Sequence, residues 1–248
     1  MLTQPAPVET NLGQLRVAFP QQSFPVGQDA EWCVVSDGSN WREFRFHDYG
    51  KIYSLPGLYE KIFMEHLKSR SHLVMAEALA LAVEQQERCL GDCRILDLGA
   101  GNGHVGARLH ELGARHLWGV DVLPEARDAA RKQHPKVYSG YSLVNSSLLR
   151  ELRDFRVNTV ICVAALGFGD IGPELFEEVL SVLPADSLVA FNIKEQFLNV
   201  LDPSGFHQLF MRLQFQGKLK PLKQWRHFHR YSTWGDPLHY LGVIARTL

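Results

Sequence analysis

The stretch Arg94-Ile95-Leu96-Asp97-Leu98-Gly99-Ala100-Gly101-Asn102-Gly103-His104-Val105-Gly106 decides the fold of this chain. Its first part is short and mostly apolar, which is typical of a buried strand. Three glycines, Gly99, Gly101 and Gly103, follow before a helical pattern begins. Glycine tolerates positive φ and lets a ligand approach the backbone closely, and the amides that open a helix can bind an anionic group. The pattern predicts a strand, a tight turn and a helix, with a ligand at the turn.

A second predicted strand, residues 116–121, ends in an acid, Asp121. An acid at the end of the second strand of a nucleotide-binding fold binds the hydroxyl groups of a ribose. The two motifs together predict a cofactor that contains adenosine.

The residue two places before Gly99 bears on which cofactor this is. A carboxylate at Asp97 would repel a pyrophosphate but could hold an ammonium group. S-adenosylmethionine (SAM) carries an ammonium, a carboxylate and a sulfonium, and no phosphate. Residues 97–103 resemble motif I of class I SAM-dependent methyltransferases, and Asp121 resembles the acid that ends the second strand in that family. The resemblance covers residues 93–246.

The resemblance implies SAM as the cofactor and a set of residues that contact it. Many relatives carry an Asp after the third strand that accepts from the adenine amino group, whereas this chain has Asn145. Its side-chain oxygen can still accept one hydrogen bond, and a role in a turn is equally open. The expected cofactor-binding residues are Asp97, Gly99, Ala100, Gly101, Asn102, Asp121, Val122, Asn145 and Ser146.

Strand and helix patterns alternate beyond residue 93, which favours a parallel sheet. The last two strands are joined by a loop that contains Gly235-Asp236-Pro237. That loop is too short for a helical crossover, so one strand must be antiparallel to its neighbour. We expect an α/β fold with a seven-stranded, mostly parallel, doubly wound sheet. The expected strands are 95–98, 116–121, 137–144, 157–165, 187–193, 225–231 and 239–246, and the expected helices 105–112, 124–133, 173–183 and 203–214.

The N-terminal part has a different pattern. Residues 1–28 are rich in Pro and Gln and are expected to be loosely ordered. Aromatic and β-branched runs at 31–36 and 41–46 flank an Asp-Gly turn and predict a β-hairpin. Residues 57–68 and 72–86 have the spacing of helices. We therefore expect residues 1–56 to form a tail, hairpin and lid, and residues 57–248 to form the methyltransferase domain.

Composition excludes some functional classes and disfavours others. The formal net charge is −1, so no general attraction to nucleic acid or anionic lipid is expected. No apolar run reaches 18 residues, and residues 1–30 do not resemble a signal peptide. A cytoplasmic protein without a membrane segment is expected, and its oligomeric state is open. The basic residues Lys218, Lys220, Lys223, Arg226 and Arg230 are interpreted as a solvated face.

No metal site is expected. Cys89 and Cys93 have no second pair at zinc spacing. His227 and His229 share one strand face but lack a third ligand nearby.

Catalytic and substrate residues are harder to place. If the nucleophile carries a proton, a base can help, and the candidates are His47, Tyr49, Glu195 and His229. Candidates for substrate contact are Tyr53, Tyr59, Asn192 and Lys194. The tyrosines at 49, 53 and 59 either pack against the core or form a lid that excludes water.

The region after the fourth strand argues against particular substrates. Residues 163–170 lack the Asn/Asp-Pro-Pro-aromatic element typical of methyltransferases that act on base amines or on glutamine. Ala164 and Ala165 cannot bind the magnesium of catechol-type enzymes. The sequence predicts a SAM-dependent methyltransferase that acts on an O, N, S or C nucleophile of a small molecule. A methyltransferase acting on protein or RNA, and a non-catalytic scaffold that binds the cofactor, are the alternatives.

Overall fold

The computed structural model describes residues 15–20, 26–168 and 170–248, and its backbone contacts form two compact units. Unit 1 contains the described residues of Met1–Arg70 together with His229–Leu238. Unit 2 contains Ser71–Phe228 and His239–Leu248. The contacts thus group residues 57–70 with the N-terminal part. The domain boundary at residue 56 stays a prediction, because compactness alone does not define a domain.

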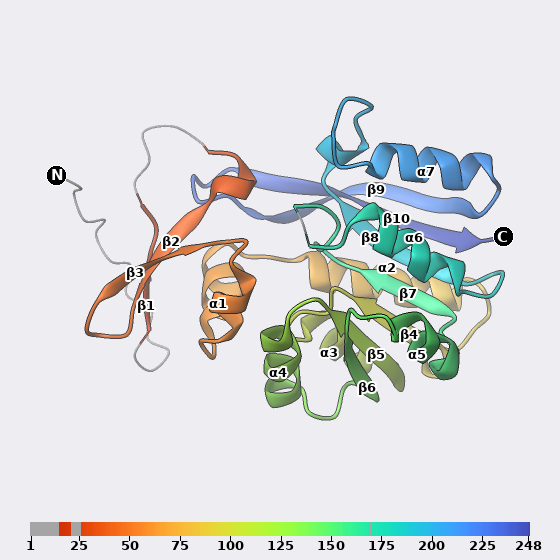
Figure 1. The fold of residues 1–248 in the computed structure, drawn as a ribbon, viewed down its shortest axis with the longest axis horizontal. Coiled ribbons are helices and arrows are strands. Elements are labelled where there is room, and N and C mark those ends of the chain that lie inside the picture. The colour runs from red at the N-terminus through yellow and green to blue at the C-terminus, as the bar shows by residue number, and fades with distance from the viewer. Residues whose placement is uncertain (1–14, 21–25, 169) are drawn as a thin grey trace. The chain divides into compact units, whose positions relative to one another are not determined.

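Unit 2 is built on a seven-stranded sheet of order β6-β5-β4-β7-β8-β10-β9 (Figure 1). The pairs among β4 to β8 are parallel, and β10 is antiparallel to β8. This confirms the predicted mostly parallel sheet with an antiparallel strand. The strands are β4 (Arg94–Leu98), β5 (His116–Asp121), β6 (Gly140–Leu143), β7 (Thr159–Cys162), β8 (Leu188–Ile193), β9 (Leu219–Tyr231) and β10 (Pro237–Thr247).

Helices cover both faces of this sheet, so the fold is doubly wound as predicted (Figure 1). On one face lie α2 (Ser71–Glu84) and α3 (His104–Glu111), which pack on Ile95 and Leu117. On the other face lie α5 (Leu148–Phe155), α6 (Pro173–Ser181) and α7 (Phe206–Phe215). Helix α4 (Pro124–Gln133) follows β5, and short 3₁₀ turns occupy Leu90–Asp92 and Glu195–Leu198.

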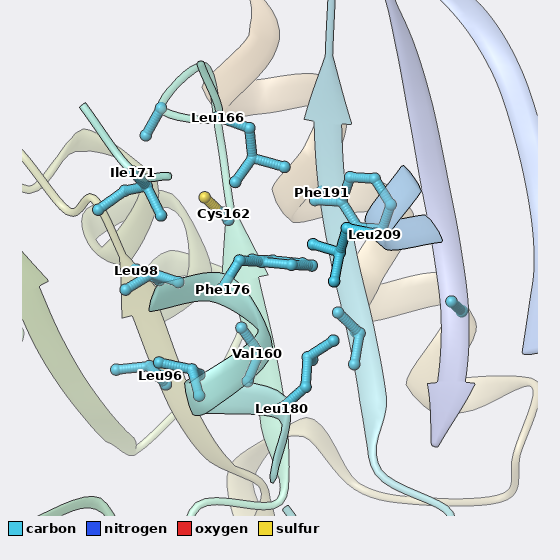
Figure 2. Close-up of a cluster of buried hydrophobic side chains, with 14 of the residues drawn as sticks. Leu96, Leu98, Val160, Cys162, Leu166, Ile171, Phe176, Leu180, Phe191 and Leu209 are labelled. Atoms are coloured by element: carbon cyan, nitrogen blue, oxygen red, sulfur yellow. The ribbon is translucent and has the colours of Figure 1, made fainter. Parts of the chain in front are cut away.

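The larger core cluster fixes the strands that carry the predicted site. Figure 2 shows Phe176 and Leu180 of α6 in one cluster with Leu96 and Leu98 of β4 and with Val160 of β7. Since side chains alternate across a strand, Asp97 projects to the opposite face, beneath α3. The carboxyl ends of β4 and β5 lie at the same edge of the parallel sheet, and this edge is where ligands bind in such folds.

Unit 1 contains a three-stranded antiparallel sheet of β1 (Arg16–Ala18), β2 (Trp32–Ser36) and β3 (Trp41–Arg45). The predicted hairpin is confirmed by the β2–β3 pairing. The expectation of a loosely ordered segment 1–28 is wrong at Arg16–Ala18, where Val17 pairs with Val35 and is buried. Residues 1–14 and 21–25 lie outside the described part of the chain.

The remaining elements of unit 1 are helical. Helix α1 (Tyr49–Tyr53) is short, and a 3₁₀ turn occupies Gln28–Ala30. The helix predicted at 57–68 is present as a π-helix over Glu60–His66. Its wider turns admit one more residue per hydrogen bond than an α-helix, which backbone spacing rules do not anticipate.

Candidate cofactor site

The glycine loop is clamped at Gly101. Its amide donates a hydrogen bond of 2.9 Å to Asp121 Oδ2, and its carbonyl accepts one of 2.8 Å from the Tyr141 hydroxyl. Asp121 is the last residue of β5, and Tyr141 lies in β6. Two neighbouring strands therefore hold the loop in place from the edge of the sheet.

Asp121 keeps acceptor capacity beyond the loop. Its second oxygen, Oδ1, accepts the Leu123 amide at 3.0 Å, so each oxygen takes one backbone donor. A carboxylate offers about four lone-pair positions, which leaves room for ribose hydroxyl groups. Burial raises the pKa of Asp121 although the amides of Leu123 and Gly101 favour its charge. The side chain is thus prepared to bind a donor or a cation.

Asp97 is completely buried beneath α3. The Tyr138 hydroxyl donates a hydrogen bond of 2.7 Å to Asp97 Oδ2. Within the described part of the chain, no group pairs with the other oxygen, Oδ1. Burial raises the pKa of Asp97 to about 7, against the opposing effect of the Tyr138 hydroxyl.

A third carboxylate, Asp170, lies in the loop after β7. Burial, and then the charge of Asp121, raise the pKa of Asp170 to about 7. Asp121 also contributes to the raised pKa of Asp97. The charge of Asp121 therefore acts on both of the other carboxylates around the glycine loop. Such an environment disfavours a pyrophosphate and favours a cation.

The loop after β7 packs directly on the glycine loop. A Cβ placed on Gly99, whose φ is +73°, would lie 2.4 Å from the Ala165 Cβ. The preceding residue, Ala164, has a φ of 56°, which is strained for a residue with a side chain. Its amide donates a hydrogen bond of 2.6 Å to Asn192 Oδ1. Asn192 thereby holds the strained loop beside the predicted site.

Asn192 lies at the centre of a buried polar network. Its side-chain nitrogen donates to Ser71 Oγ at 3.0 Å and lies 3.3 Å from His227 Nε2. His227 Nδ1 lies 3.0 Å from the Phe228 carbonyl. A proton on Nδ1 satisfies both contacts, since Nε2 can then accept from Asn192. Burial lowers the pKa of His227, which favours this neutral form.

We expect Asn192→Leu to lower the free energy of unfolding by about 1–3 kcal/mol, because the partly buried Ala164 amide and the buried Ser71 hydroxyl would lose their partner. Urea denaturation measures the change. The matched control is Asn199→Leu, since Asn199 Oδ1 also accepts a backbone amide, from Leu201, but is exposed to water. An equal loss in both variants would contradict the role given to the buried network.

The other predicted cofactor residues differ in exposure. Ala100 and Asn102 are buried in the loop, whereas Val122 is 43% exposed. Asn145 and Ser146 are exposed.

Asn145 has the geometry of a turn residue. Its nitrogen donates to the Leu143 carbonyl at 2.8 Å, and Oδ1 accepts the amide and the hydroxyl of Ser147, each at 2.7 Å. The turn leads into α5. Contact of Asn145 with adenine stays a prediction.

Among the predicted substrate and catalytic residues of unit 2, Lys194 and Glu195 follow β8. The Lys194 ammonium lies 5.2 Å from the centre of the Phe168 ring. Glu195 pairs with Arg226 at 3.4 Å, and both side chains are more than half exposed. Asn192 is internal to the network described above, so its contact with substrate stays a prediction.

The remaining predicted residues belong to unit 1. The rings of Tyr49 and Tyr53 stack at 5.9 Å, those of Tyr53 and Tyr59 at 5.4 Å, and Tyr59 reaches Phe63 at 4.8 Å. Burial raises the pKa of Tyr59.

Two histidine candidates also lie in unit 1. Burial lowers the pKa of His47, whose ring lies 5.8 Å from that of Tyr49. His229 is buried. Their catalytic roles stay predictions.

Tyr138, Tyr141 and Asp170 were not predicted from the sequence as residues of this site. The first two lie in a weakly patterned region, where nothing distinguishes a tyrosine that holds the loop from one that fills space. The spacing of Gly101, Gly103 and Gly106 was the signal in the sequence that could have indicated a closely packed side chain beside the loop. The third glycine of such a fingerprint marks close packing against its helix, and here a tyrosine ring occupies that place.

The comparisons with known proteins agree with this geometry. Residues 95–186, which include the glycine loop, Asp121 and the loop after β7, match a family model described as a methyltransferase domain. Over these residues the chain therefore resembles a methyltransferase domain, and its sheet has the α/β fold of one. A comparison with curated proteins found no match.

Solved methyltransferase structures share the fold of this domain. A putative O-methyltransferase from Klebsiella pneumoniae aligns with a TM-score of 0.51 and 13% identity over 81% of this chain and 86% of that one. Magnesium protoporphyrin IX methyltransferase from Synechocystis PCC 6803, solved with bound SAM, aligns with a TM-score of 0.50 and 13% identity over 72% and 80% of the two chains. At this identity the likeness shows the fold alone.

Proposed function

We propose that the domain binds SAM at the glycine loop and transfers its methyl group to a small molecule. The observation that carries the proposal is the group of buried and half-buried carboxylates Asp97, Asp121 and Asp170 around a loop clamped at Gly101, in which the charge of Asp121 acts on the other two. SAM brings two positive groups and a ribose to such a site. A nicotinamide dinucleotide would bring a pyrophosphate into an anionic environment. The match to a methyltransferase domain supports the same choice.

In this proposal each loop residue has a defined task. Asp121 accepts from the ribose hydroxyl groups, and Asp97 faces the ammonium. SAM supplies a methyl group on a sulfonium that is already a good leaving group. The chain's own contribution is to align the acceptor with that methyl group and to exclude water. Where the acceptor carries a proton, His47, Tyr49, Glu195 and His229 remain the candidate bases.

The surroundings of the basic residues favour a small substrate over nucleic acid. In unit 2, Lys223 lies 5.3 Å from the Trp225 ring centre, and Arg226 pairs with Glu195. In unit 1, Arg230 is buried in an ion pair with Glu31. Three of the five basic residues between 218 and 230 are therefore engaged within the protein rather than arranged as a phosphate-binding surface.

Labelled methyl transfer tests the substrate class. The protein is incubated with SAM carrying a labelled methyl group and with separate small-molecule, RNA and protein fractions of a cell extract. We expect label to enter only the small-molecule fraction. Label in RNA or protein would replace the small-molecule proposal by the macromolecular alternative. Cofactor binding without transfer to any fraction would support the non-catalytic scaffold.

We also propose that residues 47–59 form a lid whose order depends on the cofactor. The stacked rings of Tyr49, Tyr53 and Tyr59 provide a large apolar surface with polar tips, which suits a segment that closes over a pocket. Hydrogen exchange of these amides is expected to slow when S-adenosylhomocysteine is added. Exchange in the β2–β3 hairpin serves as the control. Unchanged exchange at 47–59, with the cofactor bound, would show that the tyrosines only pack within unit 1.

A further inference from the structure

Tyr138 occupies an unusual position between Asp97 and α3. Its hydroxyl donates to Asp97 Oδ2 at 2.7 Å. A Cβ on Gly106 would lie 2.3 Å from that hydroxyl oxygen and 2.4 Å from the ring carbon that bears it. These distances are far below a normal contact, so no larger residue fits at 106 while Tyr138 stays in place. The missing side chain at Gly106 therefore leaves space for the Tyr138 ring, and the backbone conformation there does not itself require glycine.

The two oxygens of Asp97 have different surroundings. Oδ2 accepts from Tyr138, while Oδ1 is buried and makes no hydrogen bond within the described ranges. The nearby Gly106 amide at the start of α3 also favours the charged carboxylate. A buried acceptor without a partner is costly and calls for an explanation. A cationic ligand group at Oδ1 would supply the missing partner and would favour the charged carboxylate.

We propose that Tyr138 is a positioning residue that fixes Asp97 through Oδ2, presents Oδ1 to the cofactor ammonium and keeps the carboxylate ionised for it. The proposal rests on the proposed SAM site. It adds that cofactor affinity depends on the ionisation of Asp97 and that this ionisation is controlled by a residue outside the glycine motif.

The direction of the pH effect follows from the hydrogen bond. The Tyr138 hydroxyl stabilises the charged carboxylate and therefore lowers the pKa of Asp97, while burial raises it. Tyr138→Phe removes the lowering contribution, so the pKa of Asp97 rises further. A larger fraction of Asp97 is then protonated at neutral pH, so affinity for a cofactor that needs the carboxylate must fall there and recover at higher pH.

Other titratable groups surround Asp97 and must be separated from it. Asp121 of β5 raises its pKa, and the charge of Asp97 raises the pKa of Tyr141 on β6 and of Cys162 on β7. Two histidine rings, His104 at the start of α3 and His134 after α4, lie 5.5 Å apart beside this region. The groups to be distinguished are Asp121, Tyr138, Tyr141, Cys162, Asp170, His104 and His134.

The test is the dissociation constant of S-adenosylhomocysteine, measured by calorimetry from pH 5.5 to 9. In the wild type we expect affinity to fall about tenfold for each pH unit below the pKa of Asp97. In Tyr138→Phe the midpoint of this fall should move to higher pH. Tyr141→Phe is the matched control, because it removes the hydroxyl of a nearby tyrosine, on β6, that bonds to the Gly101 carbonyl rather than to Asp97. It should weaken binding without moving the midpoint.

Two further arms identify the group that titrates. His134→Gln should leave the midpoint in place. 5′-Methylthioadenosine lacks the ammonium and carboxylate of the cofactor. Its affinity should therefore not fall as the pH drops through the midpoint. The proposal is overturned if Tyr138→Phe weakens binding equally at all pH values, if His134→Gln moves the midpoint, or if 5′-methylthioadenosine shows the same profile. If neither adenosine compound binds the wild type at any pH, the proposed function itself fails.

Discussion

Glu31→Ala lowers the free energy of unfolding of unit 1 by about 3–5 kcal/mol, the cost of leaving a buried charge without its partner. The Glu31 and Arg230 side chains form an ion pair with only 1% and 4% of their surface exposed. Glu31 also accepts the Thr233 amide at 2.6 Å. The substitution removes the acceptor for both groups and leaves the guanidinium of Arg230 buried, although Arg230 still donates to the Tyr231 carbonyl.

Urea denaturation followed by circular dichroism measures this loss. The control is Asp37→Ala, which breaks the Arg42–Asp37 ion pair of the hairpin, where the side chains are 59% and 47% exposed. An exposed pair contributes about 0–1 kcal/mol, so this variant should unfold almost as the wild type does. A small change in both variants would show that Arg230 finds other partners when Glu31 is absent.

Asp121→Ala is expected to raise the dissociation constant of S-adenosylhomocysteine at least about 100-fold. Each charge-assisted hydrogen bond contributes about 1.5–3 kcal/mol, two ribose hydroxyl groups are involved, and each 1.4 kcal/mol is a factor of ten. The same substitution removes the acceptor of the Gly101 amide, so the loop also loses one side of its clamp. Calorimetry at pH 8 measures the change.

Two further variants serve as comparisons. Asp121→Asn keeps one acceptor oxygen and should lose less affinity than Asp121→Ala. Asp128→Ala removes a carboxylate that is paired on the surface with Arg127 and should leave affinity unchanged. If the dissociation constant is unchanged in Asp121→Ala while circular dichroism shows an intact fold, Asp121 does not bind the ribose.

The sheet was predictable because its strands and turns carry local patterns. The strand at His116–Asp121 and the helix at Pro124–Gln133 have the predicted bounds. The antiparallel strand followed from a loop too short for a crossover. Helix α5 was not predicted, although Leu148 and Leu152 lie one turn apart and are buried. Strand β9 begins at Leu219, before the predicted residue 225, because pairing along β10 extends through polar positions that have no strand pattern.

The candidate site was predictable only where it repeats a local motif. The glycine loop and Asp121 were visible in the sequence, and the structure joins them by a hydrogen bond. The partners that hold them were not visible. Tyr138 lies 41 residues from Asp97, and Asn192 lies 28 residues from Ala164. No rule of periodicity links such pairs, because they are brought together by the order of the strands in the sheet.

Within the described residues no helix is long and apolar enough to span a bilayer. The cytoplasmic location and the small-molecule substrate stay predictions. The carboxylates around Gly101 are the structural argument for the proposed cofactor.

The most direct test of the central claim is a calorimetric titration of the unmodified protein at pH 8 with S-adenosylhomocysteine and, in parallel, with a nicotinamide dinucleotide. We expect S-adenosylhomocysteine to bind at one molecule per chain. We expect no binding of the dinucleotide, because its pyrophosphate would be repelled by the carboxylates of Asp97, Asp121 and Asp170. Binding of the dinucleotide without binding of S-adenosylhomocysteine would contradict the central claim.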